Sequence, residues 1–124
     1  MTYLDTHIAL WIYAGLTDKI SNHSLDIMNS SEILISPMVL LEIEYLYEIK
    51  KISEIPDKII IELITQYGIK QCDIPFEQVI QKARTIKWTR DPFDRIITAT
   101  AAISKSYLIS KDNLIRLNYS KTIG

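Results

Sequence analysis

The chain has 124 residues, 48% hydrophobic and 23% charged, a composition typical of one globular domain spanning residues 1–124. The formal net charge is −1 and the 14 basic residues are scattered, which excludes a protein that binds nucleic acid purely through a basic tail. No apolar run approaches the roughly 20 residues of a membrane span, and a single cysteine excludes both an internal disulfide and a zinc site built on cysteines.

The N-terminal stretch MTYLDTHIALW has an acid at position 5 and no basic leader, which does not match a secretory signal and predicts a cytoplasmic protein with no membrane partner. Short apolar runs then alternate with helical patterns, and prolines and glycines mark their ends. In chain order we expect a strand ending near Asp5, helices over 8–13 and 24–31, a strand over 33–35, helices over 37–52 and 57–67, a strand over 69–74, helices over 76–86 and 92–104, a strand over 107–110, and a candidate fifth strand at 122–123.

This alternation predicts an α/β fold, with a parallel sheet of four to five strands covered by helices on both faces. In such a sheet the ligand crevice lies at the carboxyl ends of the strands. Asp5 directly follows the first strand and Asp112 follows the fourth, so both should stand at that edge. For each, the alternative interpretation is a helix N-cap, a position that favours aspartate.

The segment RDPFDRIITATA, residues 90–101, predicts a capped helix. Asp91 followed by Pro92 matches an N-cap and a proline at the first helical position. Asp94 then lies in the first turn, where the helix dipole favours a negative charge. One cap is sufficient, so capping explains Asp91 better than Asp94.

Glu42, in MVLLEIEYLYE, lies on the apolar face of a predicted helix, whereas Glu44 and Glu48 lie on its wet face. A lone carboxylate on an apolar face costs several kcal/mol unless a cation or a basic side chain accompanies it. We therefore expect Glu42 to meet Asp5, Asp94 and Asp112 around a divalent cation. Ligands that are all oxygen favour Mg²⁺ or Mn²⁺ over zinc, and such a site activates water against a phosphodiester.

The motifs YLDTHIALW, SPMVLLEIEYL, RDPFDRIITATA and LISKD resemble, in order and spacing, those of PIN-domain nucleases, and most of all VapC-type toxins of toxin–antitoxin pairs. The resemblance runs from about Thr2 to Asp112. It implies a three-layer α/β/α sandwich and a magnesium- or manganese-dependent endoribonuclease, often acting on tRNA or other structured RNA. It also implies a cognate antitoxin and a homodimer. The acids that match the family's catalytic and metal-binding positions are Asp5, Glu42, Asp94 and Asp112, and Asp91 is a less central member. Ser110 stands where relatives often have a threonine or serine beside the site, and Thr6 is expected to orient Asp5.

Basic and aromatic residues near these motifs have simpler interpretations. Arg84, Lys87 and Arg90 recur three apart and would share one helical face, either solvated or holding RNA phosphates beside Asp94. Arg95 is a candidate ion-pair partner for one of the acids. His7 is interpreted as a structural residue.

Two other functions compete with the nuclease. One is a PIN domain that binds RNA or protein without catalysis. The other is a phosphoacceptor signalling domain, which also gathers aspartates at strand ends. Its pattern fits poorly, because the first strand supplies only Asp5 and no lysine is clearly placed near the last strand.

Overall fold

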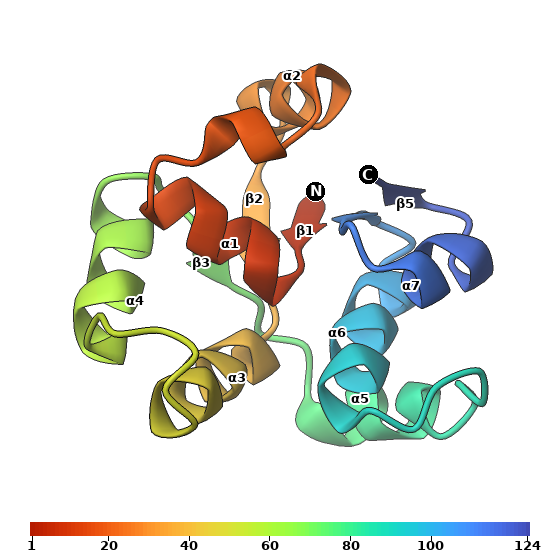
Figure 1. The fold of residues 1–124 in the computed structure, drawn as a ribbon. Helices are drawn as coiled ribbons and strands as arrows, with labels where there is room; N and C mark the ends of the chain where they lie inside the picture. The colour runs from red at the N-terminus through yellow and green to blue at the C-terminus, as the bar shows by residue number, and fades with distance from the viewer.

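The computed structural model describes residues 1–124, and Figure 1 shows its arrangement. The five strands are β1 (Thr2–Leu4), β2 (Ile33–Ile35), β3 (Lys70–Gln71), β4 (Tyr107–Ile109) and β5 (Thr122–Ile123). The helices are α1 (Thr6–Tyr13), the 3₁₀ turn η1 (Thr17–Lys19), α2 (Asn22–Ser30), α3 (Pro37–Glu48), α4 (Pro56–Thr65), α5 (Phe76–Ala83), α6 (Pro92–Ile103) and α7 (Asn113–Asn118).

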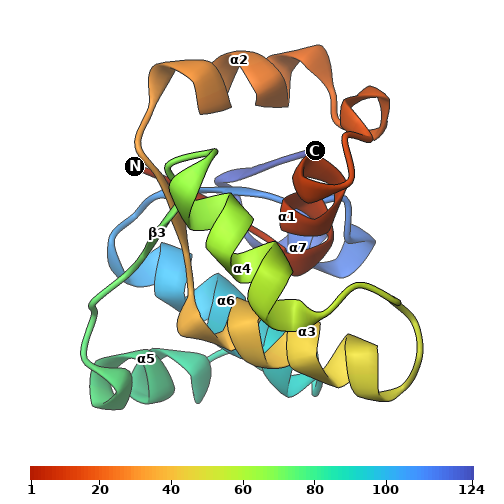
Figure 2. The ribbon, with the colours of Figure 1, turned by 90° about the vertical axis from the view of Figure 1, so that its left-hand side faces the viewer.

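All neighbouring strands are parallel, in the order β3-β2-β1-β4-β5, so β1 is the central strand. The chain first moves outward from β1 to β3 and then crosses back to β4. Right-handed crossovers therefore place the helices after β1 and β2 on one face and those after β3 and β4 on the other. Figure 1 shows α1, α3 and α4 on one side of the strands and α5, α6 and α7 on the other, and Figure 2 views the first group from its own side. The predicted three-layer α/β/α fold is confirmed.

The core lies on both faces of the three middle strands. Leu4 in β1, Ile35 in β2 and Ile109 in β4 are each 0% exposed and belong to one cluster of 18 buried residues. A strand that is covered on both faces has a continuous run of apolar residues rather than an alternating pattern. For this reason the sequence could predict these short strands. A smaller cluster, which includes Val79 and Ala99, joins α5 to α6.

The carboxyl edge of the sheet is where the helices of the functional motifs begin. Asp5 caps α1 directly after β1, Ser36 caps α3 directly after β2, and Asp112 caps α7 just after β4. Each side-chain oxygen accepts a hydrogen bond from a backbone N–H of the first turn, which satisfies a donor that has no partner within the helix. Polar side chains are thus fixed at one edge of an otherwise apolar sheet.

Two predicted boundaries on the β3 side are wrong. Helix α3 ends at Glu48 rather than near Ile52, because Lys50 turns into the left-handed region with φ 63°. Strand β3 covers only Lys70–Gln71 rather than residues 69–74. The N–H of Ile69 is taken by the carbonyl of Leu63 at 3.1 Å, which closes α4 instead of entering the sheet.

Two further differences lie in the C-terminal half. Helix α5 ends at Ala83 rather than near residue 86, where the Thr85 hydroxyl donates to the Lys82 carbonyl at 2.6 Å and Ile86 turns into the core. Helix α7 was not predicted, because its six residues carry little periodic signal. None of the helices combines the length and the apolar character that crossing a bilayer requires.

Candidate functional site

Asp5 is the most deeply buried acid of the candidate site, 6% exposed at the end of the central strand. Its Oδ1 accepts the backbone N–H of Thr6 at 2.8 Å, and its Oδ2 accepts the hydroxyl of Ser110 at 2.7 Å. Burial raises the pKa of Asp5, and the hydrogen bonds from Ser110 and Thr6 oppose that rise. The carboxylate is therefore held in one orientation by the first residue of α1 and by Ser110, directly after β4.

Ser110 also connects Asp5 to Asp112. The backbone N–H of Asp112 donates to the Ser110 hydroxyl oxygen at 3.0 Å, while Asp112 Oδ1 accepts the N–H of Ile115 at 2.9 Å. Ser110 is 0% exposed, so this short chain of hydrogen bonds lies inside the fold. The predicted placement of Asp5 and Asp112 at one edge is confirmed, and so is the capping interpretation of each.

Glu42 is half-buried on α3 and has no basic partner. The structure contains two salt bridges, Lys58–Glu54 and Lys70–Glu32, and neither involves the candidate site. The hydroxyl of Thr6 donates to Glu42 Oε1 in a short hydrogen bond. Burial raises the pKa of Glu42, and the Thr6 hydrogen bond opposes the rise. Thr6 therefore orients Glu42 through its hydroxyl and Asp5 only through its backbone.

Arg95 does not pair with an acid, so that alternative is wrong. Its Nε and Nη2 donate to the Ala83 carbonyl at 3.3 and 3.1 Å. The guanidinium thus binds the C-terminal end of α5, where the last carbonyls of a helix have no partner within it. Glu42 is left as a half-buried carboxylate without a salt bridge, whose one hydrogen bond comes from the Thr6 hydroxyl.

Asp94 carries the strongest electrostatic signal of the site. Burial raises its pKa from 3.8 to about 7, and the negative charges of Asp91, Asp5, Asp112 and Glu42 all add to the rise. Its carboxylate accepts no hydrogen bond from the protein, in contrast to the other acids. The charges of four other acids, one from the N-cap of α6 itself and three from other segments, therefore act on Asp94 at the carboxyl edge of the sheet.

Asp91 serves as the predicted N-cap of α6. Its Oδ1 accepts the N–H groups of Phe93 and Asp94 at 2.8 and 3.1 Å, and its side chain is exposed. Its charge still contributes to the raised pKa of both Asp94 and Glu42. Asp91 is thus a cap that also adds negative potential to the site.

The donor chemistry of the site fits a divalent cation. Carboxylate oxygens are the ligands that Mg²⁺ and Mn²⁺ prefer. Burial, with a smaller contribution from neighbouring carboxylates, raises the pKa of Asp5, Glu42 and Asp94, and a bound cation would favour their ionised forms. No group of three His, Cys, Asp or Glu side chains is already arranged as a set of metal ligands. Loading the site would therefore require side-chain rotation, which is simplest for Asp94 because no hydrogen bond holds its carboxylate.

A structural role for His7 stays a prediction. The side chain is exposed on the first turn of α1, and its proximity lowers the pKa of Asp5 and of Glu42. It also lines a pocket of about 700 Å³ together with Trp11, whose ring centroid lies 6.5 Å away. In the sequence, the feature that indicates this proximity to the acids is that His7 follows Asp5 by two residues.

The basic residues Arg84, Lys87 and Arg90 are exposed but do not share a helical face. Because α5 ends at Ala83, Arg84 is its C-cap and the other two lie in the loop before α6. The prediction of a helical strip is therefore wrong, although the loop does run to the first turn of α6.

Comparisons with known proteins place this geometry in context. The family model described as PIN domain matches residues 2–118. A solved structure of similar fold is that of VapBC2 from Rickettsia felis bound to a DNA fragment from their promoter. The match has a TM-score of 0.70 and 16% sequence identity, and covers 100% of this chain and 98% of the other. No curated protein gives a significant match.

Proposed function

The chain belongs to the PIN domain family, and from that premise we propose that it is a metal-dependent endoribonuclease acting as the toxin of a toxin–antitoxin pair. The observation that carries the proposal is Asp94, whose pKa of about 7 reflects burial beside four other acids. A structural acid would have a basic partner or hydrogen bonds, and Asp94 has neither. The likeness to VapBC2 supports the same fold-level assignment.

In the proposed enzyme, Asp5, Glu42, Asp94 and Asp112 would hold Mg²⁺ or Mn²⁺. The bound cation would supply an activated water and neutralise charge that builds on the phosphate. Hydrolysis forms a bond from the water oxygen to phosphorus and breaks one ester P–O bond of the RNA, leaving a phosphate end and a hydroxyl end.

The chain's own hydroxyls fix the acids for this task. Ser110 holds Asp5 and positions the backbone of Asp112, and Thr6 holds Glu42. Each carboxylate oxygen has two lone pairs, so an oxygen that accepts a hydrogen bond can still contact a cation. Near pH 7 the cation-free Asp94 is protonated in about half of the molecules, because its pKa is about 7.

The toxin assignment brings two protein partners. An antitoxin would have to cover the acidic mouth, because a free nuclease would degrade the RNA of its own cell. A second copy of the chain would use the exposed apolar side of α3, where Leu41 is 56% and Tyr45 43% exposed. Both partners come from the family resemblance.

The test is cleavage of RNA by the purified chain with Mg²⁺ or Mn²⁺, compared with Asp94→Asn. Glu44→Gln is the matched control, since Glu44 lies on the exposed face of α3. We expect the wild type and the control to cut and Asp94→Asn to lose most activity, as does the wild type in EDTA. Equal cleavage by wild type and Asp94→Asn would refute the proposal.

A second candidate is a PIN domain that binds RNA or protein without catalysis. The absence of a prearranged set of metal ligands favours it. Calorimetry with Mn²⁺ separates the two functions, because a non-catalytic domain should bind no ion at the acids. Growth arrest on expression of the chain, relieved by Asp5→Ala, would support the toxin instead. Family membership leaves the phosphoacceptor domain without support.

A further inference from the structure

Three arginines line one small pocket beside the candidate site. The pocket has a volume of about 240 Å³ and lies between α5 and the start of α6. Arg84, Arg90 and Arg95 supply its polar groups, and Ile80 and Pro92 are among the apolar side chains that form its walls. The three arginines come from the end of α5, the loop and the first turn of α6, so the fold adds Arg95 to two arginines that the sequence pattern had already grouped.

Arg95 is held in a fixed orientation within this pocket. Its Nε and Nη2 donate to the Ala83 carbonyl, and its Nη1 makes no hydrogen bond with the protein. The side chain is partly buried, whereas Arg84 and Arg90 are exposed. One guanidinium is therefore preorganised, and the other two can close around a ligand.

No carboxylate neutralises these arginines. Both salt bridges of the molecule lie elsewhere, although the chain carries 15 acidic residues. Guanidinium groups gathered around one pocket repel one another, and an anion relieves that repulsion. The planar fork of arginine matches the oxygens of a phosphate better than any other basic side chain does.

Two of the arginines that line the pocket are direct neighbours, in the chain, of two acids of the candidate site. Arg90 directly precedes Asp91, and Arg95 directly follows Asp94. The guanidinium of Arg95 is turned to α5, while Asp91 accepts the N–H groups of Phe93 and Asp94 on the same first turn of α6. The acids and the arginines thus flank the first turn of α6, which follows the α5–α6 loop in Figure 1.

We propose that the pocket of Arg84, Arg90 and Arg95 is a subsite for a backbone phosphate of the RNA substrate, adjoining the phosphate that is cut. The inference rests on the proposed function, because it assumes that RNA reaches the acids. It explains how a chain of net charge −1 can bring a polyanion to an acidic mouth. Lys87, exposed in the same loop, would extend the path of the backbone beyond the pocket.

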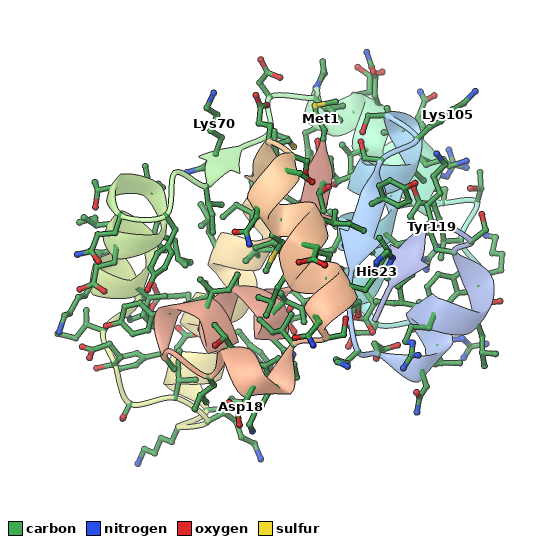
Figure 3. The ribbon with its side chains drawn as sticks, turned by 90° about the horizontal axis from the view of Figure 1, so that it is seen from above. Met1, Asp18, His23, Lys70, Lys105 and Tyr119 are labelled. Atoms are coloured by element: carbon green, nitrogen blue, oxygen red, sulfur yellow. The ribbon has the colours of Figure 1, made fainter.

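The test measures binding of a short fluorescent single-stranded RNA by anisotropy, in EDTA, with Asp94→Asn in every protein so that no RNA is cut. The variant is Arg84→Gln with Arg90→Gln, which leaves the Arg95 contact to α5 intact. The matched control is Lys50→Gln with Lys105→Gln, which removes the same charge from exposed sites; Figure 3 shows Lys105 in the view from above, at the start of β4 and so at the edge opposite the site.

We expect the Arg84→Gln, Arg90→Gln variant to lower the RNA binding constant about tenfold at roughly 0.1 M salt. The slope of log K against log salt should fall by about 0.7, the value for one lost phosphate contact. The lysine control should change neither by a comparable amount. Replacing both arginines by lysine should keep the slope and lose part of the affinity, because charge remains but the planar fork is lost. Millimolar inorganic phosphate should compete weakly with RNA, since it offers only one of the contacts.

Equal losses in the arginine pair and the lysine control would overturn the subsite, since only net charge would then matter. Unchanged RNA binding by the arginine pair would also overturn it, as would full displacement of RNA by millimolar phosphate.

A parallel cleavage assay distinguishes failure of the subsite proposal from failure of the nuclease proposal. If the wild type cuts RNA and the Arg84→Gln, Arg90→Gln variant cuts it with an unchanged KM, the subsite proposal is refuted and the nuclease proposal stands. If the wild type cuts nothing with Mg²⁺ or Mn²⁺ while RNA binding still depends on the arginines, the nuclease proposal is refuted and the phosphate subsite stands.

Discussion

Replacing Asp94 by asparagine should stabilise the protein in the absence of metal. The pKa of this carboxyl group rises from 3.8 to about 7 on folding. A raised acid pKa means that the folded state favours the protonated form, so its stabilising effect is complete below the unfolded pKa and is lost as pH rises towards 7. Above pH 7 the folded protein carries the full penalty of an ionised Asp94, and an uncharged asparagine of the same shape removes that penalty.

The magnitude follows from the shift. A rise of about three pKa units corresponds to roughly 4 kcal/mol at 1.36 kcal/mol per unit. Asp94 is only half-buried, and solvent screens such charges, so we expect about 1–2 kcal/mol of extra stability for Asp94→Asn at pH 8. The gain should grow between about pH 4 and pH 7 and then level off, because that window lies between the unfolded and the folded pKa.

Urea unfolding in EDTA across pH 4.5 to 8 measures this difference. Glu44→Gln is the control for removal of a charge from an exposed helix face and should change stability by less than about 0.5 kcal/mol. Added Mn²⁺ should reverse the order, because it stabilises the wild type more than Asp94→Asn. If Asp94→Asn were less stable than wild type at pH 8 and equally so at pH 4.5, the carboxylate would be making a favourable contact and the reasoning would be wrong.

Three further changes test the remaining supports of the site and the fold. Glu42→Gln should lower Mn²⁺ affinity in calorimetry yet leave the melting temperature equal or slightly higher, because it removes a half-buried charge without a basic partner; unfolding with no metal effect would contradict this. Ser110→Ala should destabilise the fold by about 1–2 kcal/mol in urea and move the acid limb of the cleavage profile to higher pH, because the Ser110 hydrogen bond lowers the pKa of Asp5; an unmoved limb would contradict it. Gly68→Ala should cost about 1 kcal/mol, because Gly68 has φ +66° after α4, and an unchanged unfolding midpoint would show that this turn relaxes.

The sequence predicted the elements that are buried on both faces or capped by their own residues. Strands β1, β2 and β4 and the start of α6 carried such local signals, apolar runs or an Asp-Pro pair, and were placed correctly. The errors fall where tertiary contacts decide. Strand β3 is short because Ile69 is used to close α4. Helix α5 stops early because the Thr85 hydroxyl binds the Lys82 carbonyl and Ile86 turns into the core, and Arg95, from another helix, then binds the Ala83 carbonyl.

The site was predictable to the extent that its acids were conspicuous in the sequence. Glu42 is unusual because it lies on the apolar face of its helix, and Asp94 is unusual because Asp91 already caps the helix that it belongs to. In the structure both residues lie close enough to other acids for those charges to raise their pKa values. The roles of Thr6 and Arg95 were not predictable, since a hydroxyl or a guanidinium has many available partners along the chain.

Capping and metal binding are not alternatives for the aspartates of this edge. A cap fixes one carboxylate oxygen on the backbone N–H groups of a first turn, as Asp112 does with Ile115. The same contact fixes the direction of the second oxygen, and a carboxylate with a fixed direction loses less conformational entropy when it binds a cation. Asp5 has both oxygens engaged and so is the most rigid acid, while Asp94 has neither engaged by its own helix. We infer that the rigid acids define the position of the ion and that Asp94 is the acid that moves on binding. Its replacement should therefore lower metal affinity while raising the stability of the metal-free protein.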